Sequence, residues 1–167
     1  LASLCVRKDF VCKKMLHLII RAMYGLPPVV VGVVVYLALS KDGVLGDWGF
    51  LFTIQGMIIA QTLLILPLVW GISWTGMEEI PNEVMDIYRL SDVKRPYAWL
   101  MVFEAKNQIS AAIMLAFGRA IAEVGAVMIV GGNIKGFTRT LTTSIVLETQ
   151  QGRLTEALVL GLVLLLL

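Results

Sequence analysis

The sequence predicts an all-α membrane protein, a polytopic bundle of transmembrane helices, and three observations support this fold class. Hydrophobic residues make up 58% of the 167 residues, and charged residues only 16%. The mean hydropathy is +0.84, whereas a soluble domain carries about a quarter charged residues. The apolar residues also gather in long runs, and a helix needs about 20 of them to cross a bilayer. We therefore expect one transmembrane domain over residues 1–167, with roughly three to five spans.

The first expected span covers residues 16–39. It follows a basic N-terminal segment whose last part, Met15 to Gly25, is amphipathic. A valine-rich run from Pro27 and Pro28 to Leu39 is short for a span by itself. It reaches spanning length if residues 16–26 join it, with a kink at the prolines.

The second expected span covers residues 50–74, after a turn-rich loop at residues 40–49. This run has no charged residue and is long enough to cross a bilayer. Pro67 is expected to kink the helix. The polar side chains of Gln55, Gln61 and Thr62 are expected to face protein rather than lipid.

Residues 75–98 form the polar centre of the chain, and we expect a cytoplasmic loop there. Asn82 is a suitable cap for a short helix with Glu83 in its first turn, and Pro96 allows a new helix to begin. A third span is expected over residues 99–130, then a loop at 131–153 and an incomplete fourth span at 157–167. Because so short a final run crosses only about half of the bilayer core, and because the sequence opens on Leu1, we expect truncation at both ends.

We expect the chain to cross the cytoplasmic membrane several times. The distribution of basic residues favours an orientation in which the N-terminal segment lies in the cytoplasm. The inner segments then carry about twice as many lysines and arginines as the outer ones. The inner residues are Arg7, Lys8, Lys13, Lys14, Arg21, Arg89, Lys94 and Arg95, and the outer ones are Lys41, Lys135, Arg139 and Arg153. The loop at residues 75–98 faces the cytoplasm in this orientation.

Two opposite charges, Arg119 and Glu123, fall inside the third expected span. Their spacing of four residues places them on the same face of a continuous helix, where they are expected to pair. The pair lines the translocation path in one interpretation, and it is a structural ion pair inside the bundle in the other. Gly118 and Gly125 flank it and favour close helix packing.

Several functional classes lack support in the sequence. The net charge is +2 and no long run of like charges occurs, so nucleic acid is not an expected partner. Cys5, Cys12 and the single histidine, His17, do not form a metal-binding pattern, and we expect no metal or cofactor. Neither a phosphate-binding loop nor a Ser/His/Asp set is present. We therefore expect a non-catalytic subunit, with any ATP hydrolysis supplied by another chain.

Three segments resemble one known family. The sequence AFGRAIAEVGAVMIVGGNIKGFTRTLTTSIVLETQQG, residues 116–152, closely resembles the C-terminal half of tungstate ABC-transporter permeases, which are relatives of molybdate and sulfate permeases. The segments GLPPVVVGVVVYLALSKDGVLG (25–46) and LFTIQGMIIAQTLLILP (51–67) resemble the same family. The resemblance implies a type I, MetI-like importer permease that lacks the family's first span here. It also implies a homodimer with cytoplasmic ABC ATPase subunits and an extracytoplasmic tungstate- or molybdate-binding protein.

The same resemblance implies that the 75–98 loop couples the permease to the ATPase through a short helix. The family carries a Glu-Ala-Ala…Gly motif there, but an ungapped count places those positions on Met85, Asp86 and Ile87, with Ser91 at the glycine. The coupling residues it implies in this chain are Asn82, Glu83, Asp86, Arg89, Ser91, Lys94 and Arg95.

The expected outer loop is the candidate passage for cargo from the binding protein, and its candidate residues are Gly131, Gly132, Asn133, Thr142 and Thr143. A path of hydroxyl and backbone N–H groups suits an anion that must also be released. Import of molybdate or sulfate is the alternative within the same class. A membrane scaffold without transport activity is an alternative from a different class, and an intramembrane enzyme has only Arg119 and Glu123 to support it.

Overall fold

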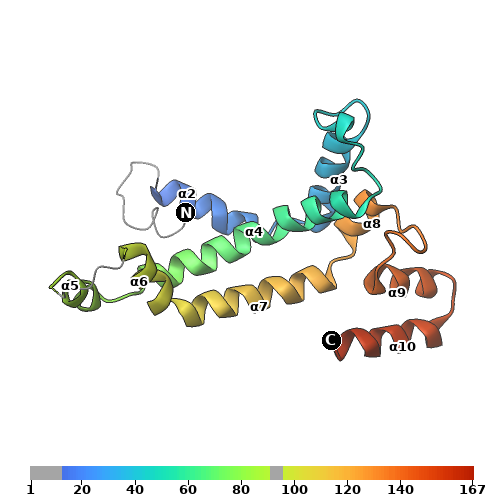
Figure 1. The fold of residues 1–167 in the computed structure, drawn as a ribbon. Helices are drawn as coiled ribbons and strands as arrows, with labels where there is room; N and C mark the ends of the chain where they lie inside the picture. Colours follow the sequence, from blue (N-terminus) through green and yellow to red (C-terminus); the bar gives the residue numbers. More distant parts are fainter. Residues whose placement is uncertain (1–12, 91–95) are drawn as a thin grey trace. The chain divides into compact units, whose positions relative to one another are not determined.

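A computed structural model describes residues 13–90 and 96–167 (Figure 1). Throughout these residues the secondary structure is helical, without a strand, which confirms the predicted all-α fold. The helices are α2 (Lys13–Met23), α3 (Pro28–Leu39), the 3-10 turn η1 (Gly46–Trp48), α4 (Ile54–Glu78), α5 (Asn82–Leu90), α6 (Tyr97–Glu104), α7 (Lys106–Ala122), α8 (Gly125–Gly131), α9 (Leu141–Gln150) and α10 (Leu154–Leu165).

The chain forms two compact units. The first contains α2, the C-terminal part of α4 from residue 65, α5, α6 and α7 up to residue 118. The second contains α3, the N-terminal part of α4, the end of α7, and α8, α9 and α10.

The core of the first unit forms where α2, α4 and α6 meet. Trp74 and Met101 are 0% and 1% exposed there, and Ile20 of α2 packs with them. A Cβ atom on Gly76 would lie 2.6 Å from Cβ of Gln108, so α4 and α7 pack closely at this point. Large apolar side chains fill this core, and the small residue Gly76 lets α7 pack beside α2, α4 and α6.

The core of the second unit combines α3, α4 and α8. Its buried residues are Val35, Leu39, Ala60, Leu64, Ala126 and Val130. A Cβ atom on Gly32 would lie 2.7 Å from Cα of Ala126, so α3 and α8 approach almost backbone to backbone. The N–H of Phe52 also donates to the carbonyl of Val130 at 2.9 Å, which joins the segment before α4 to α8.

The last two helices form a hairpin in the second unit (Figure 1). Gly152, with φ of 75°, takes the left-handed conformation in the turn between α9 and α10. The N–H groups of Gly152 and Arg153 donate to carbonyls in the last turn of α9. On α10, Leu158 and Leu162 are 70% and 61% exposed, so this helix presents an apolar face to its surroundings.

Two expected helical stretches are interrupted. The 16–39 stretch is divided into α2 and α3, because proline disfavours a helical conformation at the preceding residue and Pro28 begins the new helix. The 99–130 stretch is divided into α6, α7 and α8, with a bend of 70° between α6 and α7 at the buried Ala105. The expected kink at the prolines is therefore a complete break, whereas neither proline nor glycine marks the second break at Ala105 in the sequence.

Three expected boundaries also differ. The second run becomes α4, which begins at Ile54 and continues to Glu78, so part of the expected 75–98 loop is helical. The expected 131–153 loop contains α9, because Thr140 and Thr143 form a capping box at its N-terminus. The final run begins at Leu154 and is a helix of 12 residues.

One helix in the described part of the chain is long and apolar enough to cross a membrane by itself. This is α4, with 25 residues and a mean hydropathy of 1.8. Two further spans are possible if α2 with α3, and α6 with α7, each count as one bent segment. Four large apolar residues of α7 are 56% to 76% exposed, as expected of a surface that meets lipid or another protein: Ile113, Met114, Leu115 and Phe117.

Candidate functional site

The short helix α5 lies in the predicted coupling segment. Asn82 is its first helical residue rather than its cap, and Glu83 follows in the first turn, where a negative charge stabilises a helix. Asn82, Glu83 and Asp86 are exposed. Ile87 and Leu90 are 69% and 89% exposed, so the helix also has large apolar side chains on its surface.

The remaining predicted coupling residues are only partly visible. Arg89 lies within α5. Ser91, Lys94 and Arg95 lie outside the described residues. The structure therefore brings Asn82, Glu83 and Asp86 onto one short helix together with the apolar residues Ile87 and Leu90.

The predicted pairing of Arg119 with Glu123 is wrong in its geometry. Helix α7 ends at Ala122, so the two residues do not share a continuous helix and the four-residue spacing does not place them on one face. Within the described residues no ion pair joins them, and the Nε atom of Arg119 is buried without a hydrogen-bond partner.

Glu123 is instead the centre of a small polar network at the break between α7 and α8. Its side chain is 8% exposed, and Oε1 accepts a hydrogen bond of 3.0 Å from the N–H of Ala126. Its backbone carbonyl accepts a bond of 3.1 Å from Oγ1 of Thr142. One turn earlier, Nε2 of Gln61 donates to the carbonyl of Ala120 at 3.1 Å. These bonds satisfy backbone groups that the helix break would leave unpaired.

The predicted outer-loop residues Gly131, Gly132 and Asn133 form the turn after α8. Gly132 and Asn133 have φ of 70° and 50°, and Gly132 is the cap of α8. Nε of Arg139 donates to Oδ1 of Asn133 at 3.2 Å, and Nη2 donates to the carbonyl of Asn133 at 3.3 Å. The loop is thus held by a guanidinium that uses two of its donors on one residue.

The hydroxyl groups of this region are occupied by bonds within the chain. Thr138 is 2% exposed, and its Oγ1 donates to the carbonyl of Gly131 at 2.6 Å. Oγ1 of Thr142 donates to Glu123, and Oγ1 of Thr143 donates to the carbonyl of Thr140 at 3.2 Å. The predicted residues Thr142 and Thr143 therefore hold α9 in place, and they do not offer free donors to an anion.

Sequence reasoning expected Gln61 to face protein, but it did not assign the other residues that hold this region together. Thr138, Thr140 and Arg139 carry its bonds, and Gln61 supports the end of α7. A signal for α9 was present, because threonine, as at residue 140, is one of the residues that favour the N-cap position of a helix.

Comparison with curated proteins gives the class of this chain. It is 41% identical over 164 residues to a probable anion ABC transporter permease protein of Haloferax volcanii, an alignment that covers 95% of this chain and 71% of the relative. The chain is thus an ABC transporter permease and a membrane protein. No protein-family model matches it.

Two further relatives define the family more closely. The chain is 40% identical over 158 residues to the tungstate uptake system permease protein TupB of Peptoclostridium acidaminophilum, covering 94% of this chain and 69% of that protein. It is 27% identical over 152 residues to the molybdenum transport system permease protein ModB of Haemophilus influenzae, covering 84% and 65% respectively. This chain belongs to the family of anion and tungstate ABC-transporter permeases, and it spans about seven tenths of the length of the two more similar relatives.

Proposed function

We propose that this chain is the transmembrane permease subunit of an ATP-driven importer that moves tungstate across the cytoplasmic membrane. The observation that carries the proposal is the 40% identity, over 94% of this chain, to a tungstate uptake permease. The relative named for molybdenum transport is more distant, at 27% identity. The proposed cargo is therefore tungstate, with molybdate or sulfate as the alternative within the family.

The subunit has no catalytic role in this proposal. A cytoplasmic ATPase supplies the energy, an extracytoplasmic protein delivers the oxyanion, and a second permease copy completes the path. Helix α5 is the proposed contact with the ATPase. In support, it combines the exposed charges of Glu83 and Asp86 with the exposed side chains of Ile87 and Leu90, a mixture suited to a partner's groove.

The translocation path is proposed to pass near the break between α7 and α8. The buried Nε of Arg119 lacks a partner among the described residues, and a guanidinium is the side chain best suited to an oxyanion. The turn at Gly132 and Asn133, fixed by Arg139, is proposed to face the binding protein.

Transport by the complete system tests the cargo. The full-length permease, with its ATPase and binding protein, is reconstituted in proteoliposomes, and ATP-dependent uptake of radiolabelled tungstate is measured with molybdate and sulfate as competitors. We expect tungstate uptake that a tenfold excess of sulfate leaves largely intact, which requires a binding preference of at least about a hundredfold, or about 2.7 kcal/mol. Sulfate or molybdate competing as well as unlabelled tungstate would reject tungstate as the specific cargo.

Replacement of α5 tests the coupling contact. Residues 82–90 are replaced by a Gly/Ser linker of equal length, and the control variant carries serine at Lys41 and at Val44, which is 92% exposed. The linker variant is expected to lose ATPase co-purification and uptake, because the charged and apolar contacts are removed together, while the control retains both. Normal uptake by the linker variant would exclude α5 as the coupling helix.

A further inference from the structure

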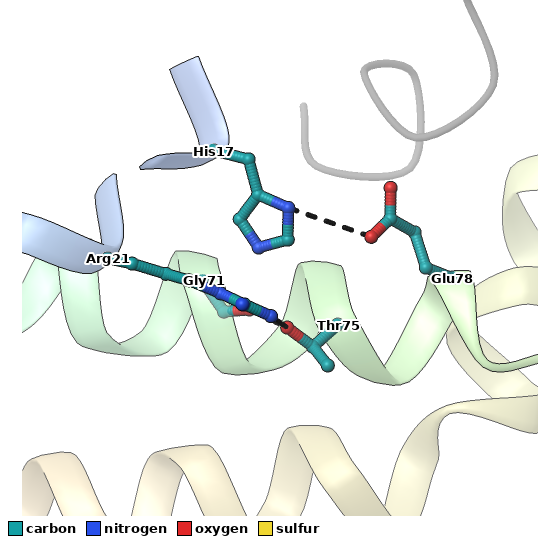
Figure 2. Close-up of polar contacts among 5 residues, drawn as sticks. All are labelled: His17, Arg21, Gly71, Thr75 and Glu78. Carbon is teal, nitrogen blue, oxygen red and sulfur yellow. Dashed lines mark hydrogen bonds and ion pairs between the residues drawn. The ribbon is translucent and has the colours of Figure 1, made fainter. Parts of the chain in front are cut away.

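Helix α2 is joined to the C-terminal part of α4 by two polar contacts (Figure 2). Nδ1 of His17 lies 3.6 Å from Oε2 of Glu78, and Nη2 of Arg21 donates to Oγ1 of Thr75 at 3.3 Å. The same Thr75 hydroxyl donates to the carbonyl of Gly71 at 3.1 Å, so it is oriented with a lone pair available to Arg21. We call these two contacts, the His17–Glu78 pair and the Arg21–Thr75 bond, the α2–α4 clasp.

Apolar and aromatic side chains pack beside the α2–α4 clasp. The ring of His17 stacks on Trp74, with centroids 5.1 Å apart and planes at 23°. Trp74 is fully buried, and Ile20 of α2 packs in the same core. A Cβ atom on Gly71 would collide with the Tyr24 hydroxyl, so α2 and α4 approach closely at this end of the contact. The imidazole and guanidinium are thus presented to α4 by packing rather than by the polar contacts alone.

The order of the contacts shows how α2 and α4 run relative to each other. His17 and Arg21 lie four residues apart on one face of α2, and Tyr24 follows directly after the last residue of the helix, Met23. They meet Glu78, Thr75 and Gly71 in descending order, so the two helices run in opposite directions. The other face of α2 does not pack against α4, since Met15 and Leu18 are 62% and 69% exposed.

The clasp lies at the end of α4 that leads into α5. Glu78 is the last residue of α4, and α5 begins at Asn82 within the same compact unit. The N–H of Glu79 donates to the carbonyl of Thr75, so the residue that accepts from Arg21 also takes part in the last turn of α4. The residues that α2 contacts thus lie directly before the segment that leads into α5.

We propose that His17 and Arg21 are positioning residues that fix the end of α4, and with it α5, so that α2 moves together with α5. This proposal rests on the proposed coupling role of α5. The polar pair is partly exposed, with side chains 16% and 35% accessible, and such pairs add little to stability. Their effect is to select one position of the α4 end, and neither residue contacts the cargo.

The Arg21–Thr75 bond gives the sharpest test. In the full-length permease with its ATPase and binding protein in lipid nanodiscs, the variants are Arg21→Ala, Thr75→Val, their combination and Arg21→Lys. Leu18→Ala, on the exposed face of the same helix, is the matched control. The first measurement is backbone hydrogen exchange of residues 79–90 in the nucleotide-free complex. The second, made with the same complexes in proteoliposomes, is the number of oxyanions carried per ATP hydrolysed.

We expect Arg21→Ala and Thr75→Val each to speed exchange of residues 79–90 and to lower the transport-to-ATP ratio, both by at least about threefold. The combined variant is expected to match Thr75→Val, because the Arg21–Thr75 bond is already absent there; the Thr75–Gly71 bond is lost in both of these variants. Arg21→Lys retains a donor and is expected to restore most of both signals, and Leu18→Ala is expected to change neither.

Unchanged exchange in Arg21→Ala, additive effects in the combined variant, or equal effects in Leu18→Ala would each overturn the proposal. Loss of folded complex is recognised separately, from the yield of assembled permease and ATPase. Failure of the proposed function has a different signature, because the unaltered complex would then carry no oxyanion. In that case the exchange measurement still decides whether the clasp holds α5.

Discussion

Replacement of Gly32 by alanine tests the closest helix contact in the second unit. Gly32 lies in α3, where an added Cβ atom would be 2.7 Å from Cα and 3.2 Å from Cβ of Ala126 in α8. The neighbouring atoms belong to the backbone and to a side chain that is fully buried, so neither can turn aside. Alanine at this position therefore has to push α3 and α8 apart.

The size of the effect follows from two opposing terms. Alanine favours the helical state over glycine by about 1 kcal/mol. Overpacking of a well-packed core costs about 1–3 kcal/mol, and contact with backbone places this site near the upper end. The net loss is about 2 kcal/mol, which lowers the melting temperature by about 4–8 °C for a chain of this size.

Gly161→Ala is the matched control, because Gly161 lies in α10 with no atom within 4 Å of an added Cβ. That variant is expected to gain about 0.4–1 kcal/mol. The melting temperature of the detergent-solubilised complex is measured by loss of the size-exclusion peak after heating. A Gly32→Ala protein that melts at or above the temperature of Gly161→Ala would refute the close packing of α3 on α8.

Two further variants test the polar network of the second unit by the same thermal assay. Thr140→Val removes the cap of α9 and is expected to lower the free energy of unfolding by about 1 kcal/mol. Thr149→Val, on the exposed side of α9, is expected to lower it much less. Equal losses would contradict the capping role. Glu123→Ala leaves the N–H of Ala126 without its acceptor and is expected to lower the free energy of unfolding by about 1–3 kcal/mol. Glu123→Gln keeps an acceptor oxygen and is expected to be more stable than the Ala variant. A Gln variant as unstable as the Ala variant would show that this bond is unimportant.

The apolar runs of the sequence predicted where helices occur, but they did not predict where those helices break. The break before α3 was partly visible, because Pro27 and Pro28 are strong local signals. The break after Ala122 was not, because it depends on the Glu123 carboxylate reaching the N–H of Ala126 and on Thr142 reaching the Glu123 carbonyl. The latter bond joins residues 19 positions apart, and periodicity carries no information about such contacts.

The same limit applies to the charged residues. A spacing of four residues predicted that Arg119 and Glu123 would pair, and the end of α7 between them removed the basis of that prediction. The single histidine, His17, carried no pattern of its own, and its partner Glu78 is distant in sequence. The packing of Ile20 in one core with the buried Trp74, and the stacking of His17 on the same ring, bring α2 to the end of α4.

The sequence by itself determined the class of this protein, since the abundance and grouping of apolar residues require helices in a membrane, and the motif at residues 116–152 specifies the permease family. Composition and short motifs suffice for this because both are properties of local segments. The tertiary structure alone decided which polar groups pair across distant segments and which helix backbones lie in contact. Each of those outcomes depends on a donor and an acceptor, or on two backbones, that meet only after distant segments have packed together.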